Sequence, residues 1–508
     1  MDLLKPILSH ASRMPNQKAL VFGDYTYTYK ELNDEINRYS NGLIKQGLKK
    51  GDKVSLFLKN SHWFVICAYA VMKAGGVIVP INFRLTAKEI HYIINQSDSI
   101  AVITDADQTE LVKSAIANIS SNPLIYSTGD TTEGVISLKE LDTTQTDDPN
   151  VPISADDDAQ ILYTSGTTGN PKGALLTHGN VISLNSAQTV MMKLNREDVY
   201  LLVAPAFHSA GLNMVLTSCF FAGATVVMMR DFHPLETLKA IEQHKVTLFF
   251  GVPAMYNAFF MIPKGSFDLS SVRGYIYGAA PMSPSMIESA VEYLGSDQFY
   301  NACGLTEGGP GGVYLTPEEH KTKLGASGKA MTFLDVRVVN HYMEDILPGE
   351  VGELIMRGES VMREYYKKPE ETAKTFRDGW LLTGDLATID DEGFITLVDR
   401  KKDMIISGGE NVYSVEVEQI LNGYPGIVES AIIGLPDPKW GEVVTAVIVK
   451  KDDIEIDEED IKAYCRGHLA GYKLPRHFIY VEALPRNVSG KILKYQLREN
   501  WKENKISQ

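Results

Sequence analysis

Apolar residues recur along the first part of the chain at two different spacings. Leu32, Ile36 and Leu43 fall on one face of a helix, and residues 64–74 form a second helical pattern. The short apolar runs 54–57 and 77–80 follow glycine-containing turns and predict strands. Strand and helix therefore alternate, which predicts an α/β fold with a parallel, doubly wound sheet.

The same alternation returns later and then gives way to other patterns. Apolar runs at 199–204, 224–229 and 246–250 predict a second sheet layer, and short strands with tight turns from 335 to 395 predict a small β-barrel. From about residue 401 the chain reads as a compact α+β unit, in which an acidic stretch, 452–460, leads into a helix at 461–469. A chain of 508 residues exceeds one hydrophobic core. We therefore expect a large N-terminal domain over residues 1–400 and a small, mobile C-terminal domain over 401–508.

Composition narrows the classes of function. An apolar fraction of 44% and a charged fraction of 22% are typical of a soluble globular protein, and a net charge of −15 argues against nucleic-acid binding. The four cysteines are far apart and form no CxxC pair, so we expect neither a disulfide framework nor a zinc site, and a reducing, cytoplasmic compartment fits.

The N-terminal residues lack the pattern of a signal peptide. The most apolar stretch, 247–263, is short for a membrane span and is interrupted by Gly251, Pro253 and Asn257, so it predicts buried core or the wall of an apolar pocket. Peripheral contact with a membrane, and the choice between monomer and homodimer, stay open.

The loop at residues 164–173 carries the strongest chemical signal. Its glycines allow successive backbone N–H groups to face an anion, its hydroxyls add donors, and a lysine near its end adds positive charge. The loop lacks the Gly-Lys-Ser/Thr ending of a Walker motif, and an apolar run that predicts a strand follows it. We predict a phosphate cradle between two strands, formed by Thr164, Ser165, Gly166, Thr167, Thr168, Gly169 and Lys172.

This loop resembles the signature of the adenylate-forming superfamily, which contains acyl-CoA synthetases, non-ribosomal adenylation domains and firefly luciferase. Five motifs in the family's order extend the resemblance over nearly the whole chain. It implies an enzyme that binds ATP and Mg²⁺, joins a small-molecule carboxylic acid to AMP with release of pyrophosphate, and then transfers the acyl group to coenzyme A.

The resemblance also implies roles for residues in the second nucleotide motif, 300–307. Glu307, with Thr168, would hold Mg²⁺ against the phosphates, and Thr306 would contact the α-phosphate. Cys303 departs from the family pattern, which usually has an aromatic residue stacked on adenine there, so more of the adenine contact would fall to its neighbours. The expected adenine-site residues are Gly278, Ala279, Ala280, Asn301, Ala302, Cys303 and Gly304.

Asp385 and Arg400 match the family's ribose-binding positions, where one carboxylate accepts hydrogen bonds from two hydroxyls. Lys491 matches the adenylation lysine, which stabilises charge between the substrate carboxylate and the α-phosphate. Lys402 matches the hinge at which the small domain turns after adenylation. Residues expected to contact coenzyme A after that rotation are Arg84, Gly408, Gly409, Trp440 and Lys473.

The acyl site is expected around His208, with Phe207, Gly211, Met214, Gly278 and Ala279. The motif lacks the Asp that amino-acid-activating relatives use for the substrate ammonium, and apolar residues at 207–214 and 255–260 surround it. A medium- or long-chain fatty acid is therefore favoured. An aryl acid, such as a benzoate, coumarate or succinylbenzoate, remains an alternative, as do a carrier protein as acceptor and a non-catalytic relative that binds acyl groups or nucleotides.

Overall fold

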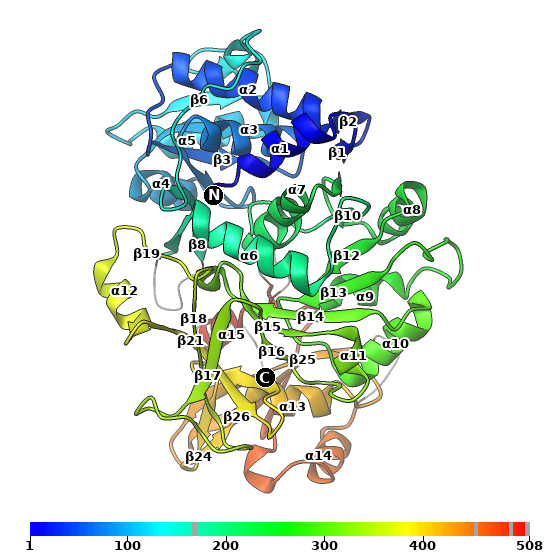
Figure 1. Ribbon diagram of the computed structural model, residues 1–508. Coiled ribbons are helices and arrows are strands. Elements are labelled where there is room, and N and C mark those ends of the chain that lie inside the picture. The colour runs from blue at the N-terminus through cyan, green and yellow to red at the C-terminus, as the bar shows by residue number, and fades with distance from the viewer. Residues whose placement is uncertain (165–169, 452–455, 487–490, 503–508) are drawn as a thin grey trace.

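The computed structural model describes residues 1–164, 170–451, 456–486 and 491–502, and these ranges contain four β-sheets. Figure 1 shows the N-terminal elements (blue) at the top, the elements from the middle of the sequence (green) across the middle, and the C-terminal elements at the bottom. Ser165, Gly166, Thr167, Thr168 and Gly169 of the predicted cradle lie outside the described residues.

The first large sheet has eight strands and confirms the predicted doubly wound pattern. Its central strands are parallel, because helices connect them, whereas β8 and β9 form an antiparallel hairpin around the predicted cradle. In spatial order the strands are β19 (Glu364–Tyr365), β9 (Lys172–Thr177), β8 (Asp158–Thr164), β4 (Val77–Pro80), β3 (Lys53–Phe57), β5 (Ser99–Thr104), β6 (Leu124–Ser127) and β7 (Ile136–Ser137).

The second large sheet has nine strands and confirms the predicted second layer. Strands β1 and β10–β14 pair in parallel, and antiparallel strands lie at both edges. The spatial order is β16 (Lys329–Ala330), β15 (Gly312–Leu315), β14 (Phe299–Gly304), β13 (Gly274–Gly278), β12 (Leu248–Gly251), β10 (Val199–Leu202), β11 (Thr225–Met228), β1 (Lys18–Phe22) and β2 (Tyr25–Thr28).

Helices cover both faces of the two large sheets, and alternation within the strands explains the layers. Leu56 of β3 and Leu202 of β10 face a shared core that also contains helices α2, α3, α6 and α7. Their neighbours point the opposite way: Phe57 packs with α4 and α5, and Leu201 packs with α8, α9 and α10. The helices are α1 (Lys5–Arg13), α2 (Tyr29–Lys45), α3 (His62–Lys73), α4 (Ala87–Gln96), α5 (Thr109–Ile116), α6 (His178–Met191), α7 (Ser218–Ala222), α8 (Pro234–His244), α9 (Pro253–Phe259), α10 (Pro284–Leu294) and α11 (Pro317–His320).

The apolar stretch at 247–263 forms β12 and α9. Tyr256 and Phe259 are completely buried in the core beside α8 and α10, and the Tyr256 hydroxyl donates to the backbone carbonyl of Ile276 (2.8 Å). The core interpretation is therefore confirmed for these two residues. Met255 and Phe260 pack at the margin of the same core.

The segment predicted as a β-barrel is an antiparallel sheet of five strands. Its ladder runs β17–β18–β21–β20, with β22 also paired to β21, and among the described residues β17 and β22 do not pair to close a ring. The five strands form a branched antiparallel ladder around one small core, which contains Val338, Leu354, Ala387 and Ile395. Its elements are β17 (Leu334–Val339), β18 (Gly352–Gly358), α12 (Pro369–Thr375), β20 (Phe376–Arg377), β21 (Trp380–Ile389) and β22 (Ile395–Arg400).

The C-terminal part contains the fourth sheet, with the predicted mixture of helix and strand. The predicted helix at 461–469 begins earlier, because Asp457 caps it by accepting from the backbone N–H of Glu459 (2.8 Å) and the acidic residues that follow form its first turn. The elements are β23 (Ile405–Ser407), β24 (Glu410–Val412), α13 (Ser414–Leu421), β25 (Ile427–Asp437), β26 (Gly441–Lys450), α14 (Glu458–Arg466), β27 (His477–Tyr480) and α15 (Lys494–Lys502).

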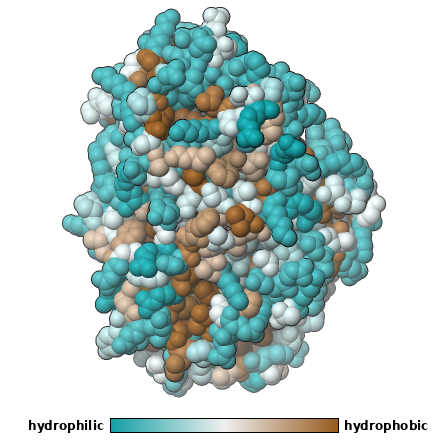
Figure 2. Space-filling view, in the orientation of Figure 1, coloured by the Kyte–Doolittle hydropathy of each residue, from teal (hydrophilic) through white to brown (hydrophobic). Residues whose placement is uncertain are grey.

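The surface seen in Figure 2 is mainly hydrophilic, with a strip of hydrophobic residues in its lower half, where the C-terminal elements lie. Within the described ranges, no helix combines the length and the apolar character needed to cross a membrane.

Candidate active site

The predicted cradle begins and ends on the β8–β9 hairpin, in which Thr164 pairs with Lys172. The Thr164 hydroxyl donates to Oε1 of Glu307 (3.2 Å), so the first motif contacts the second directly. Lys172 Nζ lies 2.6 Å from a carboxylate oxygen of Glu371 on α12 and 4.9 Å from the centre of the Tyr365 ring. The structure thus places the Lys172 ammonium and two carboxylates, those of Glu307 and Glu371, beside the described ends of the loop.

Glu307 lies in a short 3₁₀ turn, Thr306–Gly308, directly after β14. The Tyr365 hydroxyl donates to Oε1 of Glu307 (2.7 Å), the same oxygen that Thr164 reaches. Burial, followed by the Glu307 charge, raises the pKa of Tyr365, so this hydroxyl stays a donor at neutral pH. The hydroxyl oxygens of Thr306 and Ser209 lie 3.0 Å apart, which joins this turn to the predicted acyl motif.

The predicted adenine-site residues come together at the carboxyl ends of two parallel strands, where α/β folds bind ligands. Gly278 pairs with Ala302, and a Cβ on Gly278 would lie 2.3 Å from the Ala302 carbonyl oxygen, so only glycine fits there. Ala279, exposed, and Ala280, partly buried, follow β13, and Ala279 has a positive φ of 66°. Gly304 ends β14, and a Cβ on it would lie 2.2 Å from the carbonyl oxygen of Pro310.

Asn301 and Cys303 lie on β14 at positions of like orientation. The Asn301 side-chain amide donates to the Ala326 carbonyl (3.4 Å). Burial raises the pKa of Cys303 to about 12, with a smaller contribution from the Asp385 charge. Cys303 is therefore a neutral thiol that packs beside the predicted ribose site.

Asp385 and Arg400 are paired across β21 and β22. The Arg400 Nε lies 3.1 Å from Oδ1 of Asp385, and the Asp385 side chain is the more buried of the two, at 15% exposure against 39%. Thr383 shapes the preceding turn, because its hydroxyl donates to the Leu354 carbonyl (2.6 Å) and accepts from the Asp385 N–H (3.0 Å). The predicted ribose grip is thus a preformed ion pair.

Lys491 lies beside this ion pair, although it follows Arg400 by ninety-one positions in the sequence. Burial, followed by the positive charge of Arg400, lowers the pKa of Lys491 to about 8, although the Asp385 and Asp403 charges act in the opposite direction. The described conformation therefore brings the predicted adenylation lysine to the predicted nucleotide site. A lysine with this pKa is protonated at neutral pH but loses its charge in mildly basic solution.

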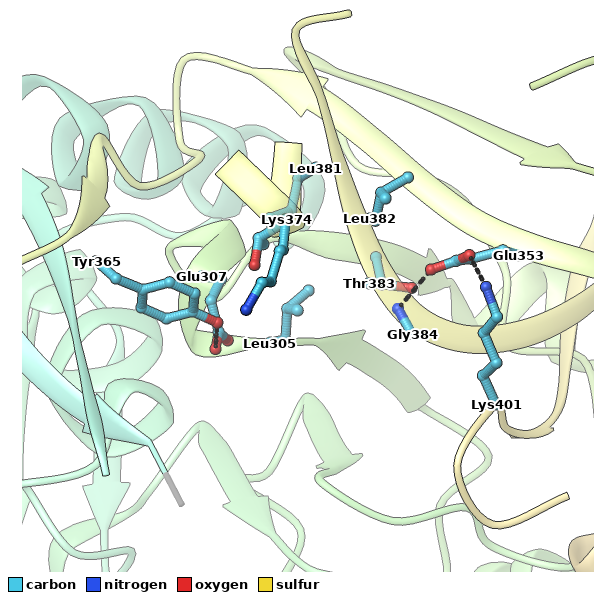
Figure 3. Close-up of a pocket in the computed structure, with 11 residues that line it drawn as sticks. Leu305, Glu307, Glu353, Tyr365, Lys374, Leu381, Leu382, Thr383, Gly384 and Lys401 are labelled. Atoms are coloured by element: carbon cyan, nitrogen blue, oxygen red, sulfur yellow. Dashed lines mark hydrogen bonds and ion pairs between the residues drawn. The ribbon is translucent and has the colours of Figure 1, made fainter. Parts of the chain in front are cut away.

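A cavity of about 320 Å³ lies between Glu307 and the turn at Thr383 and Gly384. Figure 3 shows the ammonium of Lys374 pointing towards Glu307 and Tyr365 on one side of it, while Glu353 and Lys401 form an ion pair on the other. The cavity thus connects the predicted metal-binding carboxylate with the predicted ribose turn. Its lining residues are Leu305, Glu307, Glu353, Tyr365, Lys374, Thr375, Leu381, Leu382, Thr383, Gly384 and Lys401.

The acyl motif follows β10 and continues into a largely buried π-helix, Ala210–Thr217, which contains Gly211 and Met214. Phe207 and Met214 are buried, and a Cβ on Gly211 would lie 2.4 Å from the Pro205 carbonyl oxygen. His208 is partly buried, and burial lowers its pKa, which favours the neutral imidazole. Its Nδ1 accepts a long hydrogen bond from the Ala210 N–H (3.5 Å).

The residues predicted to contact coenzyme A fall into separate groups. Gly408 and Gly409 have positive φ angles, and a Cβ on Gly408 would lie 3.0 Å from the Trp440 ring, whose centre is 4.1 Å from the Arg476 guanidinium. Lys473 pairs with Glu416 (2.7 Å). Arg84 is exposed and lies over Phe83, which in turn contacts Phe207 edge-on. Lys402, the predicted hinge, is exposed in the turn after β22.

Comparison with known proteins identifies the class to which this site belongs. The chain matches the AMP-binding enzyme family over residues 8–366 and the AMP-binding enzyme C-terminal domain over residues 416–491. It is therefore a member of the AMP-binding enzyme family, in its AMP-forming acyl-CoA ligase branch, as the sequence motifs predicted.

Two relatives have equal sequence identity but different acids in their names. A feruloyl-CoA synthase of Amycolatopsis sp is 39% identical over 493 residues, which cover 97% of each chain. A long-chain-fatty-acid–CoA ligase of Mycobacterium tuberculosis is 39% identical over 483 residues, or 94% of each. ATP-bound MatB from Rhodopseudomonas palustris has a TM-score of 0.92 at 29% identity, over 99% of this chain and 100% of that one. This chain therefore shares its fold with MatB and its reaction class with the two CoA-forming relatives, and those two relatives differ in the acid that their names give.

Four residues near the predicted site had not been expected there: Tyr365, Glu371, Lys374 and Ser209. Tyr365 and Glu371 lie 58 and 199 positions from the residues they contact, Glu307 and Lys172. Ser209 follows His208 directly, so its position in the acyl motif was a signal that could have been used.

Proposed function

We propose that this acyl-CoA ligase activates a medium- or long-chain fatty acid. The acid's carboxylate oxygen bonds to the α-phosphorus of ATP as the bond to the bridging oxygen breaks and pyrophosphate leaves. The sulfur of coenzyme A then bonds to the acyl carbon, AMP leaves, and the thiol proton passes to solvent. The observation that carries the proposed reaction is the position of Lys491 beside the Asp385–Arg400 pair.

The chain's own residues divide the first step among them. Asp385 accepts hydrogen bonds from the ribose hydroxyls, and Arg400 holds that carboxylate in place. Lys491, protonated at neutral pH, lies between the two anionic reactants and stabilises the charge that moves between them. A preorganised donor of this kind typically contributes about 3–4 kcal/mol to the transition state. Lys172 and Thr164, which lie at the two ends of the predicted cradle, contact the terminal phosphates, and Thr306 contacts the α-phosphate.

The residues near Glu307 fit a magnesium ion bound jointly with ATP. Mg²⁺ prefers oxygen ligands and usually takes one or two carboxylates together with phosphates. Both hydroxyl donors to Glu307 reach Oε1, and a carboxylate offers a second oxygen to a cation. Within the described residues no group of three or more His, Cys, Asp or Glu side chains could hold a metal ion alone, which agrees with a site that ATP completes. When bound, the ion neutralises phosphate charge.

We further propose the domain division at residues 400 and 401, with rotation of the C-terminal domain about Lys402 between the two steps. Rotation takes Lys491 away and brings Gly408, Gly409 and Trp440 to the site. The close approach of Gly408 to the Trp440 ring, where a Cβ would lie 3.0 Å from a ring atom, supports this role because it brings two of the three residues together.

A fatty acid is supported by the buried apolar side chains of Phe207 and Met214 beside His208. The second candidate is an aryl acid, which the equal identity to a feruloyl-CoA synthase and the ring contact between Phe83 and Phe207 favour. Coenzyme-A-dependent AMP release, measured with straight-chain acids of increasing length and with ferulate, coumarate, benzoate and o-succinylbenzoate, separates the two.

For a fatty-acid site we expect kcat/KM to rise by about fourfold per methylene until the pocket is filled, because each buried methylene contributes about 0.8 kcal/mol. A preference for an aryl acid over every straight-chain acid would refute the substrate assignment while leaving the reaction class intact. Transfer to a carrier protein but not to coenzyme A would refute the assigned acceptor.

Lys491→Ala tests the assigned chemistry. We expect ATP–pyrophosphate exchange to fall by about 10²–10³-fold. Thioester formation from supplied acyl-AMP should change little, because Lys491 has left the site by then. Equal loss of both half-reactions would refute the role.

A further inference from the structure

A buried polar network surrounds the first residue of α15, three positions after Lys491. Lys494 Nζ lies 2.7 Å from Oε1 of Glu418 and donates to the Ser414 hydroxyl (2.5 Å). The side chains of Lys494 and Glu418 are only 11% and 14% exposed, so this ion pair is largely shielded from water. Glu418 also accepts from the backbone N–H of Ile432 (2.7 Å), which fixes its orientation within the C-terminal sheet.

The network continues to the residue next to Arg400. The Ser414 hydroxyl donates to Oδ1 of Asp399 (2.9 Å), and the Ser414 N–H donates to Oδ2 (2.5 Å). Asp399 is 6% exposed and also accepts from the Arg400 N–H (2.7 Å). One chain of contacts therefore runs from Lys494 through Ser414 to Asp399, beside the Asp385–Arg400 pair.

The segment between Lys491 and Lys494 has little freedom to move by itself. Ile492 forms a β-bridge with Arg486, and the Leu493 N–H donates to the Pro485 carbonyl (2.8 Å). Three residues span at most about 10 Å when extended. The position of Lys494 therefore restricts where the Lys491 ammonium can lie.

We infer that Lys494 and Ser414 are positioning residues for adenylation, which hold Lys491 at the nucleotide site by binding the start of α15 to Asp399. The inference rests on the proposed role of Lys491 and extends it. Asp399 precedes Lys402, whereas Ser414, Glu418 and Lys494 follow it. Rotation about Lys402 therefore breaks the bonds between Ser414 and Asp399 but leaves the Lys494–Glu418 pair intact.

Two variants test this inference, and the double one removes both members of the Lys494–Glu418 ion pair, so neither of them is left buried alone. Ser414→Ala removes one hydroxyl and keeps the backbone N–H. The double variant Lys494→Met/Glu418→Gln removes both charges, and its glutamine oxygen still accepts from Ile432. Ser430→Ala is the matched control, because Ser430 is a buried serine of the same domain whose hydroxyl contacts Asn422 (2.8 Å) and not Asp399.

Each variant is assayed for ATP–pyrophosphate exchange and for thioester formation from supplied acyl-AMP, with thermal unfolding as the check on folding. For Ser414→Ala we expect kcat of exchange to fall about tenfold, the size of one hydrogen bond to a charged group. The double variant should approach the loss caused by Lys491→Ala. KM for ATP and the rate of thioester formation should stay within twofold, and Ser430→Ala should resemble the parent in both assays.

The results separate failure of this inference from failure of the proposed function. Unchanged exchange in both variants, or equal losses in the two half-reactions, would overturn the positioning role while Lys491→Ala still affects exchange alone. If Lys491→Ala itself reduces both half-reactions equally, the proposed function fails first.

Discussion

The lowered pKa of Lys491 predicts how adenylation depends on pH. An ordinary lysine has a pKa of 10.5, and burial together with Arg400 lowers that of Lys491 to about 8. Its ammonium is therefore about 90% protonated at pH 7 and about 10% at pH 9. Since only the protonated form can stabilise the reacting anions, kcat/KM of ATP–pyrophosphate exchange should fall about tenfold between pH 7 and pH 9.

The groups around Lys491 determine the direction in which its pKa shifts. Burial and the positive charges of Arg400 and Lys402 favour the neutral amine, whereas Asp385 and Asp403 favour the ammonium. Arg400→Gln removes the largest opposing charge, so the falling limb of the profile should move to higher pH, whatever the loss in absolute rate. Bound ATP adds negative charge, which raises the pKa of Lys491, so kcat should begin to fall at a higher pH than kcat/KM does.

The assay compares the two half-reactions of one enzyme preparation between pH 6.5 and 9.5. Thioester formation from supplied acyl-AMP is the internal control, because in the proposed mechanism it does not use Lys491 and should lack this limb. A profile of exchange that stays flat to pH 9.5, or an Arg400→Gln limb at lower pH than that of the parent, would refute the reasoning.

Three further substitutions test the rest of the site. Gly278→Ala places a Cβ 2.3 Å from a carbonyl oxygen of β14, so we expect loss of nucleotide binding in ATP titrations; parental affinity would show that the strands can separate. Tyr365→Phe removes one donor to Glu307, worth about 1.5–3 kcal/mol for a charged acceptor, so the Mg²⁺ concentration for half-maximal exchange should rise; an unchanged Mg²⁺ dependence contradicts this. Glu371→Gln removes the ion-pair partner of Lys172, so KM for ATP should fall, and a higher KM would mean that Glu371 instead orients the lysine for the phosphates.

Local patterns were sufficient to predict most of the fold. Adjacent residues such as Leu201 and Leu202 face different cores, so both faces of this strand are buried. The sequence shows such strands as short apolar runs between amphipathic helices. In the segment predicted as a β-barrel, short strands and tight turns indicate antiparallel pairing but do not determine whether the first and last strands pair. Closure depends on how β17 and β22 twist, which no single segment encodes.

The site was predictable to the extent that each residue belongs to a contiguous motif. Glu307 and Asp385 lie in such motifs, whereas Tyr365 and Glu371 meet their partners only through the tertiary fold. Tyr365, the first residue of a Tyr-Tyr-Lys-Lys-Pro segment, carries no local signal that its hydroxyl reaches a carboxylate. The Asp399–Ser414 bonds have the same origin, because they join a strand end to a helix start across fifteen positions of sequence.

The charge distribution gives a physical reason for the proposed movement of Lys491. The chain as a whole carries a net charge of −15, yet Arg400, Lys491, Lys172 and Lys374 are placed at or near the predicted nucleotide site. Several cations are needed there to bring together two anions, ATP and a carboxylate, that would otherwise repel each other. Once pyrophosphate has left, the same concentration of positive charge would hold AMP and oppose its release. In the proposed mechanism, rotation removes Lys491 and so lowers that charge at the step that needs less of it, and a variant unable to rotate should therefore accumulate acyl-AMP.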